Sequence, residues 1–142
     1  MKEKETHQLL NSLKQAESFK TAISETKPHT IEYNIEQQLS DWLNKKKLSK
    51  SSVLRKAGIA EATGYQYFDG KRKPPRERLI ALGIGMTLTL DELNELLKKT
   101  GFAQLYPKNS WDAVVIYGII QQLTIPEIDD LLYQESLKTF TD

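Results

Sequence analysis

Two short apolar patterns that meet at a single glycine constrain this chain more than any other feature of its sequence. Ser49 is a suitable N-cap for a helix. Val53, Leu54 and Ala57 follow it at a spacing that places them on one helix face. Gly58 stands just past them, where a glycine in the left-handed conformation ends a helix and turns the chain sharply. These residues predict a short helix that closes at a tight turn.

A second short helix is predicted directly after the turn, over about residues 60–68. Ile59 lies between the two helices, where its side chain can pack into the angle that they form. The Asp-Gly pair at 69–70 ends the second helix, and three basic residues follow. The proline pair at 74–75 then opens the next helix, because proline is tolerated in a first turn.

Positive charge is concentrated on this segment. Residues 45–78 hold eleven Lys and Arg against three acidic residues, a local net charge of +8, so that the rest of the +1 chain carries −7. Lysine and arginine gathered in this way attract phosphates and displace the counterions condensed on DNA. The alternative is an ordinary solvated surface around a helical bundle.

The order of these features resembles the phage-repressor helix-turn-helix family, the Cro/C1 or XRE type of bacteria and phages. The resemblance covers about residues 35–101 and implies an all-α fold with a five-helix, lambda-repressor-like core. The matching features are the Leu48-Ser49 start, the Gly58 turn, a recognition helix at 60–68, a Gly-Lys-x-x-Pro loop at 70–74, a fourth helix at 79–85 and a leucine-rich fifth at 88–93.

The resemblance implies roles for particular residues. The start of the recognition helix faces the bases, where Gln66 can pair with an adenine edge. The helix before the turn and the basic loop hold phosphates. The expected base-facing residues are Ala60, Glu61, Thr63, Tyr65 and Gln66, and the expected phosphate contacts are Lys50, Ser51, Lys71, Arg72, Lys73 and Arg76.

One position departs from the family pattern. Gly64 stands where the family has a branched apolar residue that pins the recognition helix to the core, and glycine costs about 1 kcal/mol of helix propensity against alanine. We expect Tyr67 and Phe68 to fill the vacancy. Glu61 also places an acid near phosphates, so modest sequence specificity, or a repurposed helix that binds a protein, stays open.

The chain nearly repeats itself at an offset of thirty-five residues after this unit. Residues 88–97 align with 123–132, and Gly83-Ile84 aligns with Gly118-Ile119. Each copy has a Thr-x-x-Glu capping box at the start of its second helix. The repeat predicts that residues 113–117, an apolar run that could be strand or helix, are helical. The hairpin at about 110–137 then extends the bundle or forms a dimer surface.

The remaining segments give weaker signals. Residues 1–30 carry apolar residues at roughly helical spacing, so they form either an amphipathic helix, packed on the rest or on a second copy, or a frayed tail. A helix is expected from about Tyr33 or Ile35 to Lys46. We expect an N-terminal segment at 1–30, a helix-turn-helix domain at 31–101 and a C-terminal helical hairpin at 102–142. The inward-facing residues expected in the first core helix are Ile35, Leu39, Trp42 and Leu43.

Catalytic and metal-binding patterns find no support in the sequence. The chain has no cysteine, and His7 and His29 have no partner at ligand spacing. Asp129 and Asp130 are interpreted as solvated surface. We expect no enzyme activity, no cofactor and no metal, and, without a signal peptide or membrane span, a soluble cytoplasmic protein.

Two functions remain. The first is a DNA-binding transcriptional regulator that binds double-stranded DNA as a homodimer on a two-fold operator, with one recognition helix for each half-site. The alternative is a non-enzymatic adaptor that keeps the helix-turn-helix fold and holds a protein partner through its C-terminal hairpin or its N-terminal segment.

Overall fold

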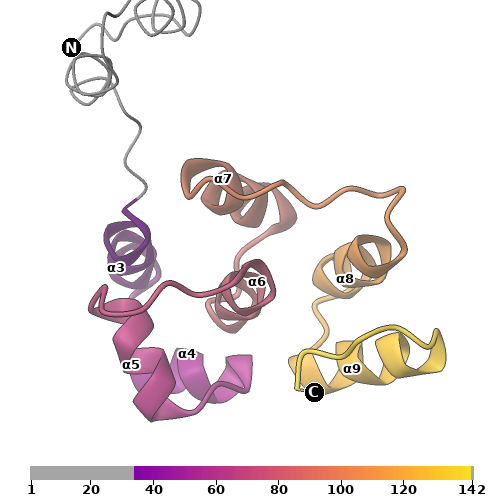
Figure 1. Ribbon diagram of the computed structural model, residues 1–142, viewed down its shortest axis with the longest axis horizontal. Coiled ribbons are helices and arrows are strands. Elements are labelled where there is room, and N and C mark those ends of the chain that lie inside the picture. Colours follow the sequence, from indigo (N-terminus) through magenta and orange to yellow (C-terminus); the bar gives the residue numbers. More distant parts are fainter. Residues whose placement is uncertain (1–33, 142) are drawn as a thin grey trace, which may run out of the picture. The chain divides into compact units, whose positions relative to one another are not determined.

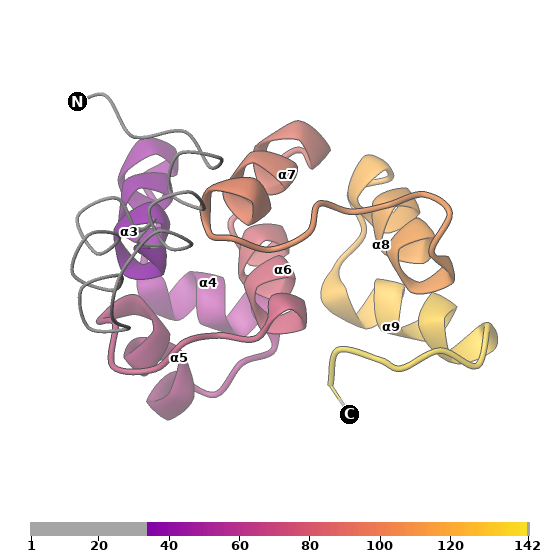
Figure 2. The same ribbon diagram turned by 45° about the horizontal axis from the view of Figure 1, so that its top comes forward.

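Local capping explains where most of the helices begin. The computed structural model describes residues 34–141, and in this part of the chain all regular structure is helical, which confirms the expected all-α class (Figures 1 and 2). Five of the seven helices have an N-cap whose side chain accepts a backbone N–H. The helices are α3 (Ile35–Lys46), α4 (Lys50–Ala57), α5 (Glu61–Phe68), α6 (Arg76–Gly85), α7 (Leu90–Lys99), α8 (Ser110–Ile120) and α9 (Ile125–Gln134). The predictions for residues 1–30 lie outside the described part.

The turn between α4 and α5 has the expected form. Ser49 caps α4 by accepting the N–H of Ser52 over 3.2 Å. Gly58 ends α4 with φ 72° and ψ 28°, the left-handed conformation that glycine adopts without strain. Ile59 is buried after it, and α5 starts after Ala60, whose side chain makes no capping hydrogen bond.

The core lies between α3, α4, α6 and α7 and continues towards α9. Helix α4 packs on α6, α3 on α5, α6 on α7, and α8 on α9. Trp42 is in the core, as expected, and the Lys45 ammonium lies 4.8 Å from the centre of its ring. The largest fully buried side chains are Leu39, Leu54, Leu79, Ile80, Leu82, Met86, Leu93, Leu96, Leu97, Ile125, Ile128 and Leu132.

The two copies of the repeat fold alike, α6 and α7 forming the first and α8 and α9 the second. Thr87 and Gln122, at equivalent positions between the helices, both have left-handed backbones, with φ of 56° and 58°. The next residue donates its N–H back to a glycine carbonyl, over 3.0 Å in the first copy and 2.8 Å in the second. Both expected capping boxes are present, at the starts of α7 and α9, and α8 is a helix, as the repeat predicted.

The copies also match beyond their helices, which corrects one expectation. Asn94 Oδ1 accepts the N–H of Leu105 over 2.9 Å, and thirty-five residues on, Asp129 Oδ1 accepts the N–H of Phe140 over 2.7 Å. Asp129 is therefore buried, with 9% of its surface exposed, and the prediction of a solvated position for it is wrong. Its carboxylate holds the C-terminal segment, whereas Asp130 is exposed.

Arg76 joins the two copies. Its guanidinium donates to both carboxylate oxygens of Asp112, over 3.1 and 2.9 Å, and to the carbonyls of Ala103 and Gln104 over 3.0 and 3.2 Å. Asp112 also accepts the N–H of Tyr106 over 2.9 Å. One arginine at the start of α6 thus fixes both the connection between α7 and α8 and the first turn of α8.

Candidate nucleic-acid interface

Helix α5 presents an exposed face opposite the side that packs on the core. Glu61, Ala62, Tyr65 and Gln66 are exposed and adjacent around the helix, and we name them the α5 face. Tyr65 has 40% of its surface exposed, which is high for an aromatic residue. Thr63 is half-buried beside this face. A helix with one open side of this kind can enter a groove without unpacking.

The opposite side of α5 is held by a close approach that the sequence did not reveal. Gly64 is buried against α4, and a Cβ added to it would lie 2.8 Å from Leu54 Cγ and closer still to both methyl groups. Leu54 therefore occupies the space that a branched residue at position 64 would take. The prediction that Tyr67 and Phe68 fill this space is wrong, although both side chains are buried elsewhere in the core.

The loop after α5 has an ordered backbone and exposed basic side chains, of which Lys71 lies 3.9 Å from Asp69 Oδ2 in an exposed ion pair. Asp69 Oδ1 accepts the N–H of Lys71 over 3.0 Å, and Arg72 donates its N–H to the carbonyl of Gln66 over 3.2 Å. Gly70 has φ 80°, and a Cβ on it would lie 2.9 Å from the carboxyl carbon of Glu36. The exposed side chains of this loop, which we name the basic loop, are Lys71, Arg72 and Lys73.

The start of α4 lies at the same end of α5. Lys50 and Ser51 are exposed in the first turn of α4, and the Lys50 ammonium lies 5.8 Å from the ring centre of Phe68, the last residue of α5. First-turn N–H groups and a lysine can hold a phosphate together. The structure thus brings Lys50 and Ser51 close to the end of α5 from which the basic loop leaves.

Among the described phosphate contacts that the sequence predicted, Arg76 differs because its charged group is held in a largely buried ion pair, whereas the pair of Lys71 with Asp69 is exposed. All its hydrogen bonds described above go to Asp112 and to the segment before α8, and only 26% of its side chain is exposed. Its nearest anion is a carboxylate of the same chain. We therefore assign Arg76 to the support of the fold and not to the interface.

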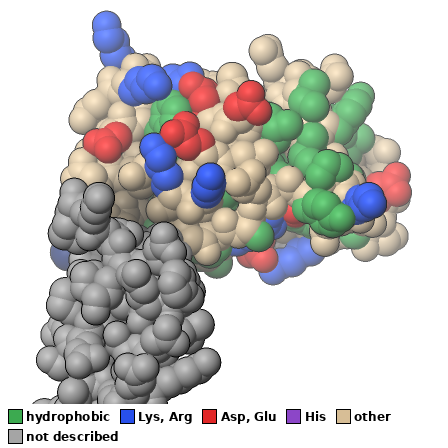
Figure 3. Space-filling view, turned by 90° about the horizontal axis from the view of Figure 1, so that it is seen from above, with side chains coloured by type: hydrophobic (Ala, Val, Ile, Leu, Met, Phe, Trp, Pro, Cys, Tyr) green, Lys and Arg blue, Asp and Glu red, His purple; other side chains and the backbone are tan. Residues whose placement is uncertain are grey.

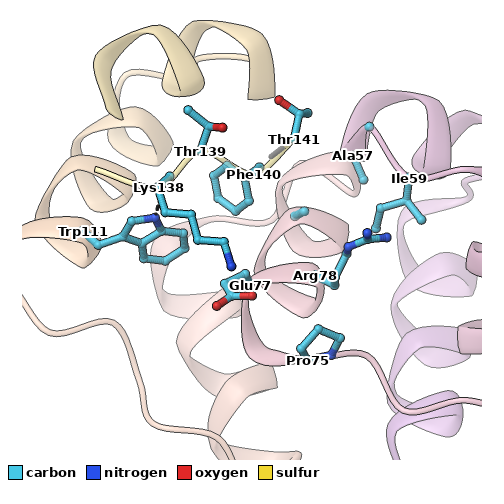
Figure 4. Close-up of a pocket in the computed structure, with 12 residues that line it drawn as sticks. Ala57, Ile59, Pro75, Glu77, Arg78, Trp111, Lys138, Thr139, Phe140 and Thr141 are labelled. Carbon is cyan, nitrogen blue, oxygen red and sulfur yellow. Dashed lines mark hydrogen bonds between the residues drawn. The ribbon is translucent and has the colours of Figure 1, made fainter. Parts of the chain in front are cut away.

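A cavity of about 400 Å³ lies behind the turn between α4 and α5 (Figure 4). Its walls include Gly58 and Ile59 from the turn, Arg78 from α6, and the C-terminal segment. The C-terminal segment is fixed there because Trp111 Nε1 donates to the carbonyl of Lys138 over 2.8 Å. Sequence patterns gave no signal for this cavity, since it depends on where residues 138–141 fold back.

Comparisons and structural searches add no named relative. No protein-family model, no curated protein and no solved structure matches the chain. Within residues 34–141, no helix is long and apolar enough to cross a membrane, and no three His, Cys, Asp or Glu side chains gather as a set of metal ligands. The α5 face, the basic loop and the start of α4 are therefore the features of the chain that indicate a function.

Proposed function

We propose that this chain is a DNA-binding transcriptional regulator that places α5 in the major groove of double-stranded DNA and holds the phosphates with the basic loop. One observation carries the proposal: two sets of exposed cations, Lys50 at the start of α4 and the basic loop after α5, gather at the C-terminal end of α5, next to its exposed face. Phosphate contacts beside one end of a helix fix its register on the duplex, and the exposed face of the helix then meets base edges.

Within the α5 face, the side chains differ in what they can read. Gln66 can form a bidentate pair with adenine, and Tyr65 offers an exposed ring and hydroxyl one turn from the helix start. Ala62 is small and Glu61 is acidic, so they contribute little attraction near phosphates. We therefore expect a moderate preference for sequence on top of a strong, salt-dependent affinity for any duplex.

The test is duplex binding by the full chain as a function of salt. The variant Arg72→Ala/Lys73→Ala should weaken binding to all sequences alike and reduce the slope of log K against log salt by about 2, since each lost phosphate contact removes roughly 0.9. Lys98→Ala/Lys99→Ala is the matched control, because it removes the same charge from two exposed residues at the end of α7. Equal effects of the two variants would contradict the proposed interface.

A second candidate is a non-enzymatic adaptor that uses the same fold to hold a protein. The small and acidic residues at the start of α5, Ala60, Glu61 and Ala62, favour it, because none of them suits strong base contacts. An adaptor should bind no duplex pool appreciably even at low salt. That outcome would exclude the regulator and leave the adaptor.

A further inference from the structure

Helix α8 is apolar on every side but is covered on only one. Its single charged residue, Asp112, is buried and bonded to Arg76. Val115 is fully buried, whereas Tyr117 and Ile120 on the other side have 55% and 60% of their surface exposed. A helix that is apolar all round is normally covered all round. The open side of α8 is therefore an unpartnered surface.

The open side has the pattern of a helix-packing surface. Ala113, Ile116, Tyr117 and Ile120 follow one another at spacings of three, one and three residues, which places them in one stripe along the helix. We name these four residues the α8 stripe; Tyr117 and Ile120 are exposed, whereas Ala113 and Ile116 are half-buried and Ile116 also contacts the core. Hydrophobic side chains gather over this part of the surface in the space-filling view (Figure 3).

The internal repeat indicates what such a stripe receives. The residues of α6 that correspond to Ile116, Tyr117 and Ile120 are Ala81, Leu82 and Gly85. All three are buried, and a Cβ on Gly85 would lie 2.6 Å from the carbonyl oxygen of Val53 and 3.3 Å from Ala57 Cβ. Helix α4 thus covers this side of α6. In the first repeat unit α4 covers this side of α6, and in the second unit Tyr117 and Ile120 on the same side of α8 are exposed.

A groove of about 530 Å³ extends the apolar surface beyond the C-terminal end of the stripe. It lies between the turns of the two copies, and Ile120 belongs to both the stripe and the groove. A stable interface between two proteins buries about 1,200 to 2,000 Å² in total, more than four side chains supply alone. The apolar residues that line the groove are Ile84, Leu88, Leu90, Ile119, Ile120 and Leu123.

We propose that the α8 stripe pairs with the α8 stripe of a second copy of this chain, in an antiparallel helix contact about a two-fold axis. The α8 stripe carries no charge, so the stripes of two chains can meet without bringing like charges together. A charged partner, by contrast, would gain no ion pair from this surface. In a two-fold interface the same patch serves on both subunits, and a helix stripe can meet its own copy in this way. This dimer rests on the proposed function in one respect, because a regulator on a two-fold DNA operator needs two recognition helices, one from each chain.

The experiment is sedimentation of the full chain without DNA, so its result does not depend on DNA binding. We expect a dimer whose dissociation constant rises at least about tenfold in Tyr117→Asp. Tyr133→Asp is the matched control, because Tyr133 is also a tyrosine of this region, is 79% exposed, and lies outside the stripe and the groove. It should leave the dimer unchanged.

A cross-link tests the geometry directly. The chain has no cysteine, so a disulfide in a single-cysteine variant can form only between two copies. Tyr117→Cys, near the middle of the stripe, should give a covalent dimer on mild oxidation, and Tyr133→Cys should not. Since both side chains are exposed, neither variant disturbs the core.

Three results would overturn the proposal. The first is a wild-type chain that stays monomeric up to roughly 100 µM, a weak limit for a functional dimer. The second is a dimer that survives Tyr117→Asp unchanged. The third is loss of the dimer in Leu13→Asp/Phe19→Asp, which alters two apolar residues of the N-terminal pattern and would assign the contact to that segment.

Discussion

The guanidinium of Arg76 and the carboxylate of Asp112 form a two-point ion pair that closes the second helical hairpin onto the first. The two N···O distances are 3.1 and 2.9 Å, and the Asp112 side chain is only 7% exposed. Arg76 begins α6 and Asp112 stands in the first turn of α8, thirty-six residues later. Two charges desolvated together in this way are strongly coupled, and removal of either leaves the other without its partner.

Asp112→Ala should therefore lower the free energy of unfolding by about 2 kcal/mol or more, because it leaves Arg76 unpaired and also removes the acceptor for the Tyr106 N–H. Urea denaturation of the full chain measures this change. Glu95→Ala is the control, since Glu95 forms an exposed pair with Lys99 one helical turn away, and an exposed pair of this kind contributes little to stability. Equal losses in the two variants would contradict the assigned role of Arg76.

Gly64→Val should destabilise the protein even though valine is the better residue for many helix–helix contacts. Its branched side chain would overlap Leu54, and such overpacking costs about 1 to 3 kcal/mol. The double variant Gly64→Val/Leu54→Ala should be more stable than the sum of the two single effects predicts, because alanine at 54 makes room for the added methyl groups. Additive effects in this cycle would show that Leu54 does not fill the space beside Gly64.

Glu92 should make stability depend on pH in the acidic range. The Thr89 N–H that it accepts, and then Lys46, lower the pKa of the Glu92 carboxyl below its ordinary value of 4.5. Because the folded-state pKa is depressed, the contribution of Glu92 is present above pH 4.5 and is lost as the pH falls through the lower, folded value.

Glu92→Gln isolates this charge, since glutamine can still close a capping box. The variant should be less stable than wild type at pH 7, and the difference should disappear as the pH falls through the depressed folded-state pKa of Glu92. Thermal unfolding across this range measures the difference. A gap between the two proteins that is constant with pH would contradict an electrostatic role for Glu92.

Gln66→Ala should change which sequences bind more than how tightly the chain binds DNA in general. If Gln66 pairs with a base, its loss removes about 1 to 3 kcal/mol of discrimination at one position of the site. Selection from a random duplex pool with wild type and variant measures this. Gln134→Ala serves as the control, because Gln134 is an exposed glutamine at the end of α9. Identical selected motifs for wild type and Gln66→Ala would remove Gln66 from the set of base-contacting residues.

Most of the helices in residues 34–141, and the starts of several, could be predicted from the sequence, although α6 begins earlier and α7 ends later than expected. Caps such as Ser49 and Thr89 and the glycine at 58 act on backbone groups within about four residues, so their effect is visible in a linear pattern. The thirty-five-residue repeat added to these local signals, because its alignment with the segment of α6 predicted that the segment of α8 is also a helix. The all-α class was predicted from these local signals together with the helix-turn-helix pattern that they form.

The way in which side chains distant in sequence share space and charge could be seen only in the folded molecule. Leu54 fills the gap beside Gly64, Arg76 bonds Asp112 rather than lying free beside the basic loop, and Asp129 is buried beneath the C-terminal segment. Packing and ion pairing depend on distances in space, and no periodicity or spacing along the chain encodes those distances. For the same reason the open side of α8 appeared only once its neighbours were in place.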